Sequence, residues 1–469
     1  MSNDNRYPQR PEDPRRRYNS NARRKKKKSF IIRRILLIAL VVVVLATTIA
    51  FIVISVKNNK ADNPPKTTSS GQSTSKPDDK KGNDKVKPVS TASILSTGDM
   101  LIHESLLSGA SQGNGVYDFT KSFNYVKDIV SDADLAVCNL EVTFGGTAKK
   151  YSSFPLFNTP DTLADALKSA GFDLLLTANN HSYDSQAAGI KRTPQVIKEK
   201  DLLSTGTRTD KSQKPYLVKD VKGIKFGFLN YTYETAPDAQ GRKALNGNFM
   251  TPEAGELVNS FNYDKLDQFY TDAKSKIDAM QKDGAEVIML YLHWGTEYQI
   301  TPNEDQKEIA KKMCDLGVDV LIGGHPHVIQ PVETIKSEST GNKMVCLYSC
   351  GNALSNQRIS MMGLKTGHTE DGIMFYTTFK KYSNGEVRLE KVDYIPTWVN
   401  IAQIGQKKIH QIIPLKNIMN TTDNLGLNAE TAKNAKSSYE RTQKLVGSGV
   451  DAFNQSASQE QKPTQKDAA

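Results

Sequence analysis

The sequence predicts a layered α/β domain, and three observations carry that prediction. From about residue 91 to residue 415, short apolar runs alternate with amphipathic stretches, which is typical of α/β or layered sandwich folds. Polar side chains, among them four of the seven histidines, follow the carboxyl ends of these runs. A charge-free run of 22 residues, 35–56, precedes the domain and has the length of a membrane-spanning helix.

Basic charge is concentrated before the apolar run. Residues 1–34 carry 13 Lys and Arg against 3 Asp and Glu, which accounts for +10 of the chain's net charge of +11. The rest of the chain is therefore nearly neutral, which argues against a nucleic-acid partner. A basic cluster beside an apolar span indicates that this end stays in the cytoplasm. We expect a basic cytoplasmic tail over 1–34, and a single-pass anchor in the cell membrane over 35–56 with the remainder extracytoplasmic. A cleaved signal peptide is the alternative, although its apolar region is usually shorter.

The segments on either side of the domain are polar. Residues 57–90 are rich in Lys, Pro, Ser, Thr and Asp, and this composition predicts a flexible linker. Residues 416–469 predict a polar C-terminal tail, with a helix over 429–445 and disorder from Asn454 onward. The four cysteines do not indicate a disulfide framework, because Cys346 and Cys350 fall in one predicted strand about 13 Å apart.

Within the domain, apolar runs of four to six residues are the candidate strands. They cover residues 93–96, 135–138, 172–176, 224–229, 287–292, 318–322 and 344–348. Amphipathic stretches between them are the candidate helices, and these cover residues 119–130, 160–169, 187–198, 265–282 and 303–316. Pro160 and Asn303 are typical of helix starts, and Gly171 and Gly317 of helix ends. Residues 231–262 lack periodicity, and we interpret them as a loop that covers a substrate.

Most strand ends are followed by residues that can bind a metal ion. In chain order they are Asp99, Glu141, Asn180 with His181, His293, and His325 with His327. Ligands of open α/β sheets bind beyond the carboxyl ends of the strands, so these side chains are expected to gather at one edge. Carboxylate, amide and imidazole donors together suit Mn, Fe or Zn rather than Ca. A carboxylate shared by two ions would create a two-metal centre.

This ordered set of motifs resembles the CapA family of poly-γ-glutamate capsule biosynthesis proteins, which have a calcineurin-like metallophosphoesterase fold. The resemblance covers residues 93–357. The matching motifs are Gly98-Asp99, Asn139-Leu140-Glu141, Asn179-Asn180-His181, His293-Trp294-Gly295, Gly324-His325-Pro326-His327 and Ser349-Cys350-Gly351-Asn352. Each motif is weak alone, but six in the right order are specific. The resemblance implies a layered metallophosphoesterase-like β-sandwich flanked by helices over residues 91–415.

The resemblance also implies roles for the strand-end residues. It assigns Asp99 and His327 to a first divalent ion, Asn180, His293 and His325 to a second, and Glu141 to both. His181 would be the general acid or a hydrogen-bond donor to the transition state. Trp294, Glu297, Ser349 and Asn352 are candidate substrate-binding residues, although Trp294 would also suit core packing, Glu297 could be a solvated charge and Asn352 could belong to a turn.

Two positions depart from the general phosphoesterase pattern. The usual Asp-x-His opening is absent, because His103 lies four residues after Asp99. The bridging carboxylate is Glu141, where phosphoesterases usually have Asp. The ligands of the first ion are therefore incomplete or different in this chain.

The resemblance implies a part in the synthesis or export of an anionic capsule polymer such as poly-γ-glutamate, with membrane-bound polymer synthase subunits as partners. Three activities stay open at this point. They are metal-dependent hydrolysis of a phosphoester-type bond, metal-dependent amide hydrolysis of the polymer, and a non-catalytic scaffold role in a synthase or export complex.

Overall fold

The computed structural model describes residues 86–415 and 427–460. The predicted cytoplasmic tail and membrane anchor lie outside these residues, as does nearly all of the predicted linker. Within residues 86–415 and 427–460, no helix combines the length and the apolar character that a membrane crossing requires.

The first of two large sheets has eight strands. Its order is β19 (Lys407–Pro414), β18 (Val387–Ile404), β17 (Asp371–Tyr382), β1 (Pro88–Met100), β4 (Leu135–Leu140), β5 (Leu174–Leu176) and β6 (Leu203–Thr205), with β16 (Asn352–Leu354) paired to the end of β1. Strands β1, β4, β5 and β6 are parallel, whereas β17, β18 and β19 are antiparallel. The carboxyl ends of β1, β4 and β5 therefore lie at the same edge.

The second large sheet has seven strands. Its order is β11 (Ser260–Phe261), β8 (Ile224–Tyr233), β12 (Val287–His293), β13 (Val320–Gly324), β15 (Lys343–Leu347) and β14 (Val332–Lys336), with β7 (Leu217–Val221) paired to β8. Strands β8, β12, β13 and β15 run parallel. This parallel arrangement brings His293, the last residue of β12, beside Gly324, the last residue of β13.

The two sheets pack face to face, and helices cover their outer faces. Inward-facing residues such as Ile94, Val137, Phe226 and Met289 form one buried cluster between the sheets. The neighbouring residues along each strand point the other way, as the two-residue period of a strand requires. The result is the layered α/β sandwich that the sequence predicts.

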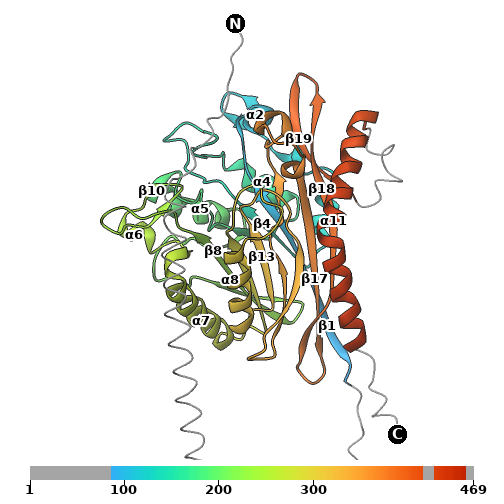
Figure 1. Ribbon diagram of the computed structural model, residues 1–469. Coiled ribbons are helices and arrows are strands. Elements are labelled where there is room, and N and C mark those ends of the chain that lie inside the picture. Colours follow the sequence, from blue (N-terminus) through green and yellow to red (C-terminus); the bar gives the residue numbers. More distant parts are fainter. Residues whose placement is uncertain (1–85, 416–426, 461–469) are drawn as a thin grey trace, which may run out of the picture. The chain divides into compact units, whose positions relative to one another are not determined.

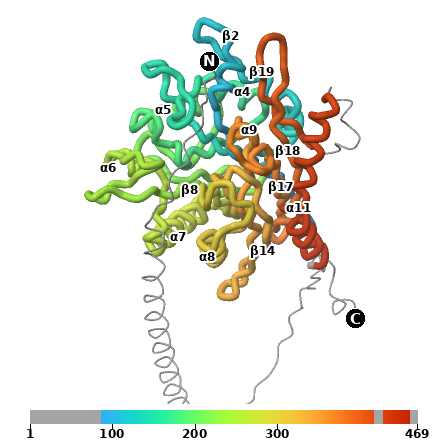
Figure 2. The backbone as a smooth tube through the Cα atoms, turned by 45° about the horizontal axis from the view of Figure 1, so that its top comes forward, coloured from blue at the N-terminus to red at the C-terminus, as the bar shows by residue number. Residues whose placement is uncertain are grey.

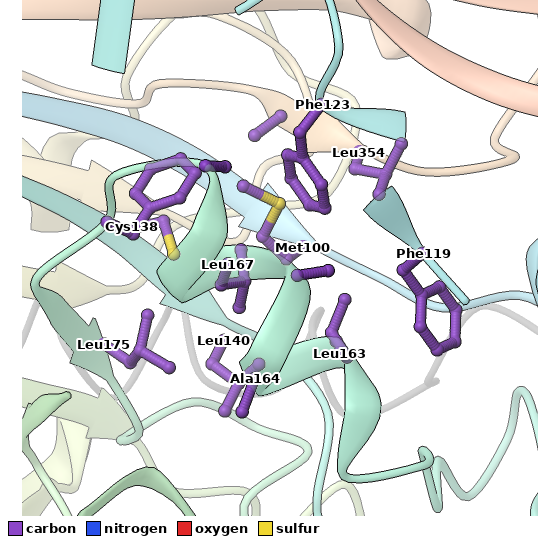
Figure 3. Close-up of a cluster of buried hydrophobic side chains, with 14 of the residues drawn as sticks. Met100, Phe119, Phe123, Cys138, Leu140, Leu163, Ala164, Leu167, Leu175 and Leu354 are labelled. Atoms are coloured by element: carbon purple, nitrogen blue, oxygen red, sulfur yellow. The ribbon is translucent and has the colours of Figure 1, made fainter. Parts of the chain in front are cut away.

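One set of helices covers the first sheet and another set covers the second. The first set comprises α2 (Glu104–Ala110), α3 (Lys127–Ser131), α4 (Thr162–Ser169) and α5 (Gln186–Glu199), and the second comprises α7 (Leu266–Lys282) and α8 (Glu304–Asp315). Figure 3 shows Leu163 and Leu167 of α4 packed with Cys138, Leu140 and Leu175 of the first sheet. On the second sheet, Phe269 of α7 and Ile309 of α8 pack in the same buried cluster as Leu290.

One predicted helix is wrong, and the strands that were missed include the three long ones next to β1. Instead of one helix, residues 119–130 form a short 3₁₀ turn, Thr120–Ser122, and then the start of α3. The segment before α3 is rich in Thr, Ser, Phe, Asn and Tyr, which are weak helix formers. Strands β17, β18 and β19 were not expected. They form a meander beside β1. Half-buried and exposed residues interrupt their apolar runs, so their hydrophobic pattern is weaker than that of the buried parallel strands.

The C-terminal segment is more ordered than expected. The predicted helix is confirmed as part of α11 (Ala429–Glu460), but the disorder expected from Asn454 is wrong up to Glu460. In Figures 1 and 2, α11 lies along β17 and β18. Its residues Val446, Val450 and Phe453 join the cluster between the sheets. Their spacing of three and four residues places them on one face of the helix, so α11 closes one side of the sandwich.

The region 231–262, interpreted as a covering loop, contains short elements. These are a two-strand hairpin of β9 (Ala244–Leu245) and β10 (Asn248–Phe249), then α6 (Pro252–Gly255) and β11. The tip of this hairpin reaches the candidate site. The four cysteines are free and buried.

Candidate metal centre

The candidate ligands come together where the carboxyl ends of the two sheets meet. Asp99 lies near the end of β1, Glu141 directly after β4 and His293 at the end of β12. His325 and His327 follow β13. All five side chains are buried. Glycine makes this convergence possible, because a Cβ on Gly98 would lie 1.9 Å from the carbonyl oxygen of Gly351.

Asp99 is held by hydrogen bonds from three directions. Its Oδ1 accepts from Nδ2 of Asn139 at 2.8 Å, and its Oδ2 accepts from the backbone N–H of His325 at 3.1 Å. Nδ1 of His327 lies 3.2 Å from the same Oδ2. Burial alone would raise the pKa of Asp99, but the hydrogen bond and charge of His327 lower it below its ordinary value. Asp99 is therefore a fixed, ionised carboxylate.

Glu141 is the buried carboxylate at the middle of the cluster. Neither of its carboxylate oxygens has a hydrogen-bond partner among the described residues. Its Oε1 lies 3.4 Å from Nε2 of His293 and 3.8 Å from Nε2 of His327. A buried carboxylate without a hydrogen-bond donor is costly, and a cation between it and the imidazoles would satisfy it.

Two overlapping groups of ligand atoms surround Glu141. One consists of Asp99, Glu141 and His327 and the other of Glu141, His293 and His325, and within each group all ligand atoms lie within 4.8 Å of one another. Glu141 belongs to both groups, as a bridging carboxylate would. Nδ1 of His325 is buried and has no hydrogen-bond partner among the described residues. These free donor atoms fit a pair of divalent ions.

Asn180 adds an amide oxygen to the second group. Its Oδ1 lies 2.8 Å from Nε2 of His293. Its Nδ2 donates to Oδ1 of Asn246 at 3.0 Å, which turns the amide oxygen toward the imidazole. The three residues that the resemblance assigns to a second ion are therefore brought together.

The electrostatics of the histidines differ. Burial and the neighbouring imidazoles of His293 and His327 lower the pKa of His325 well below its ordinary value, so His325 is neutral, as a ligand must be. Burial alone would also lower the pKa of His327, but Glu141 and Asp99 raise it to about 10. Nδ1 of His327 lies 3.1 Å from Oδ1 of Asn352, and this bond leaves Nε2 as the nitrogen free for a metal ion.

Backbone strain is concentrated in the segment that carries the two histidines. His325 has φ +92° and His327 has φ +56°, although neither is glycine. Non-glycine residues with positive φ are uncommon, and they cluster at functional sites where surrounding structure holds them in place.

Residues 93–357 match the family described as bacterial capsule synthesis protein PGA_cap. The matched segment spans more than half of the chain and contains every strand-end residue described above.

The chain belongs to this family.

Two capsule proteins of Bacillus are similar to this chain in sequence. The PGA biosynthesis protein CapA of Bacillus subtilis strain 168 is 25% identical over 313 residues, which cover 65% of this chain and 74% of that protein. The capsule biosynthesis protein CapA of Bacillus anthracis is 32% identical over 193 residues, 41% of this chain and 42% of that protein. Among solved structures, sulfate thiohydrolase SoxB of Thermus thermophilus in complex with glycerol aligns with a TM-score of 0.32 and 11% identity, over 69% of this chain and 46% of that one.

In this capsule synthesis family member, His181 lies beside the ligands. Its Nδ1 is 2.7 Å from Oδ2 of Asp184, and that oxygen also accepts from the backbone N–H of Phe157 at 2.7 Å. Burial alone would lower the pKa of His181, but the charge and hydrogen bond of Asp184 raise it above its ordinary value. His181 is thus placed to carry a proton, and Asp184 fixes its ring.

Three of the candidate substrate-binding residues do not face the site. Trp294 is fully buried in the core of the second sheet, where its indole N–H donates to the carbonyl of Tyr348 at 3.0 Å. Ser349 is fully buried, and its hydroxyl accepts from the backbone N–H of Gly351. Asn352 is fully buried and orients His327. For these three residues the structure shows contacts within the protein, and substrate contact stays a prediction, whereas Glu297 is exposed near His325 and His327.

Sequence reasoning missed Asn246. Its Nδ2 lies 3.4 Å from both ring nitrogens of His181, and its Oδ1 holds Asn180. Asn246 has φ +47°, a conformation that Asn tolerates better than most residues. The Asn246-Gly247 pair is a hairpin signal, but nothing in the sequence connects that turn to the site.

Proposed function

We propose that this protein serves the synthesis or export of an anionic capsule polymer such as poly-γ-glutamate, through a two-metal centre that hydrolyses a phosphoester-type bond. Membership of the capsule synthesis family supports the process. The name of the Bacillus subtilis relative supports the polymer class, and that of the Bacillus anthracis relative supports the capsule process. We further propose a metallophosphoesterase-like active site, with two ions of Mn, Fe or Zn.

One observation carries the catalytic part of the proposal. Glu141 places a buried carboxylate without a hydrogen-bond partner between two groups of imidazole and carboxylate ligands. Bound divalent ions would act there as Lewis acids that activate water and offset charge on the substrate. The metal-binding atoms of these two groups follow different strands, so the whole fold keeps them in place.

His181 is the proposed general acid. Asp184 binds Nδ1 of its ring and keeps the imidazole protonated to higher pH. Among the described residues, Nδ2 of Asn246 lies 3.4 Å from Nε2 of His181. This nitrogen would donate the proton to the leaving group.

The cellular placement rests on the sequence. The basic segment 1–34 and the apolar run 35–56 support a single-pass anchor with its amino end in the cytoplasm and the described domain outside. Membrane-bound synthase subunits and the anionic polymer are the proposed partners. Reporter fusions on either side of residues 35–56 test the orientation.

Hydrolysis of a generic phosphodiester by the purified full-length chain, with Mn²⁺ or Zn²⁺ added, tests the activity. We expect turnover that needs the metal and that the double variant His325→Ala with His327→Ala abolishes. Turnover unaffected by the double change would refute the site.

A non-catalytic scaffold predicts a different pattern. The purified chain would lack stoichiometric metal, and the Asp99→Ala variant would still support capsule formation. Release of new amino termini from the polymer, without phosphoester hydrolysis, would instead show a metal-dependent amide hydrolase.

A further inference from the structure

The two groups of ligands in the proposed centre are unequal. The second group has four protein donors, namely Glu141, His293, His325 and the amide oxygen of Asn180. The first group has three, namely Asp99, Glu141 and His327. The position where phosphoesterases have the histidine of Asp-x-His carries Leu101 in this chain.

His103 does not make up the difference. Its Nδ1 accepts from the backbone N–H of Asn356 at 3.1 Å, and its ring lies edge-on to Phe157 with the centroids 5.6 Å apart. His103 belongs to none of the ligand groups formed by the described residues. His103 therefore binds the loop that contains Asn356 and does not join the candidate metal ligands.

Glu297 does form a ligand group. Its carboxylate oxygen and one ring nitrogen each of His325 and His327 lie within 4.8 Å of one another. His325 also brings a buried Nδ1 without a hydrogen-bond partner among the described residues. Glu297 is thus a carboxylate at the open side of the cluster, next to imidazoles that already serve the other two groups.

The backbone around Glu297 is fixed to the segment that carries both histidines. Before it, Trp294 N–H donates to the carbonyl of Gly324 at 3.1 Å, and after it, Tyr298 N–H donates to the carbonyl of Pro326 at 2.7 Å. Tyr298 has φ +65°, and its ring lies 6.3 Å from that of His327. These two hydrogen bonds hold the Glu297 backbone in register with His325 and His327.

We propose that Glu297 is a further ligand of the ion held by Asp99, Glu141 and His327. The proposal rests on the two-metal centre proposed above. With Glu297, that position has three carboxylates and one imidazole, a set that suits Mn²⁺, whereas the imidazole-rich second position suits Zn²⁺ or Fe²⁺. The absent Asp-x-His histidine is thereby replaced by a carboxylate from the loop after β12.

Titration of Mn²⁺ into the metal-stripped full-length chain in detergent tests this ligand. Calorimetry gives the stoichiometry and dissociation constants, and electron paramagnetic resonance counts the free ions. We expect two ions for the wild type. In Glu297→Gln, we expect one dissociation constant to rise at least about tenfold and the other to stay within twofold, since even outer-shell partners of a metal change affinity by 10–100-fold.

Two further variants sharpen the result. Glu338→Gln is the matched control, because Glu338 is an exposed glutamate in the loop before β15, at the opposite end of that strand from the site. Glu297→His should keep both ions, with the affinity of the affected position moved from Mn²⁺ toward Zn²⁺.

Several outcomes would overturn the proposal. Two ions bound by Glu297→Gln with wild-type affinity would do so, and turnover lost at unchanged binding would make Glu297 a substrate contact. A wild-type chain that binds no Mn²⁺ under any condition would refute the metal centre itself, and with it this ligand.

Discussion

The pair of His181 and Asp184 shows how one hydrogen bond sets the acid–base behaviour of the site. Oδ2 of Asp184 accepts from both His181 and the backbone of Phe157. The Phe157 ring packs edge-on against His181, with centroids 4.8 Å apart. The same partner therefore fixes the imidazole in position and raises its pKa.

Asp184→Asn should move the pH dependence of turnover. A general acid must be protonated, so activity falls as pH rises through the pKa of His181. Because Asp184 raises that pKa, its loss should shift the alkaline limb of the kcat/KM profile to lower pH. A profile whose alkaline limb does not move would exclude His181 as the acid. Ion binding should be retained, since Asp184 belongs to none of the ligand groups among the described residues.

His410 predicts an acid sensitivity of the fold. It is buried, and its Nε2 donates to Oδ1 of Asn356 at 2.8 Å. Burial, with the charge of Arg358, lowers its pKa from 6.5 to about 4. The unfolded chain therefore binds a proton that the folded chain does not, and stability falls as pH drops from 6.5 toward 4, by on the order of 3 kcal/mol.

His410→Gln should reduce this loss, because glutamine can keep a donor toward Asn356 and does not titrate. Denaturant unfolding of the metal-stripped chain at pH 7 and pH 4.5 measures the difference. An equal loss of stability in both proteins would assign the acid sensitivity to other groups, such as His103, whose pKa burial lowers to about 3.

At the scale of elements, α11 is connected to the ligand His327. Arg441 of α11 binds Asp371 through two hydrogen bonds of 2.7 and 2.6 Å, and Asp371 begins β17. Two residues earlier, the carbonyl of Thr369 accepts from Nδ2 of Asn352 at 2.9 Å, and Oδ1 of Asn352 binds His327. The C-terminal helix thus supports a proposed metal ligand from outside the family-matched segment 93–357.

Arg441→Gln should weaken both the fold and the centre. Asp371 is 2% exposed in this pair, and breaking a buried pair by removing one partner costs about 3 kcal/mol. Denaturant unfolding and Mn²⁺ titration measure the two effects. Arg388→Gln is the matched control, because the Arg388–Glu386 pair is 44% exposed at both residues and should contribute less than about 1 kcal/mol. Equal effects of the two variants would contradict the link to α11.

The elements show what the sequence could and could not predict. The longer parallel strands were predicted because buried strands of such sheets are near-continuous apolar runs, and β12 (Val287–His293) is an example. Each ligand then followed from its position after a strand. Strands β17 to β19 were missed because intermediate and exposed residues interrupt their apolar pattern. Asn246 was missed because its place at the site depends on a hairpin that folds back over 60 residues from Asn180 and His181.

The direction in which a side chain points was harder to predict than its position after a strand. Trp294 follows His293 directly, yet its side chain points into the core, since successive residues of a strand face opposite sides. The same alternation was available in the sequence for Trp294. It was not available for Ser349 in the turn after β15, or for Asn352 at the start of β16, because the direction of the chain there depends on contacts with β1 and Thr369.

For the whole molecule, metal binding and folding stability should be coupled. The ligands come from both sheets, so the unfolded chain lacks the site, and a ligand that binds the folded state alone stabilises it by about 2.7 kcal/mol at a hundredfold excess over its dissociation constant. We expect EDTA treatment to lower the melting temperature by several degrees and Mn²⁺ to restore it. An unchanged melting temperature would contradict the centre. The His325→Ala, His327→Ala double variant should not respond to Mn²⁺.

The long pairing of β1 with β17 has a consequence for any shortened form of the protein. β17 pairs with β1 from Pro88 to Thr97 and shields its backbone groups on that side. A chain ended at residue 357, where the family match stops, would leave this 13-residue strand as a sheet edge. Exposed edges of that length recruit other chains. Such a fragment should therefore aggregate through β1 even though it contains every proposed metal ligand.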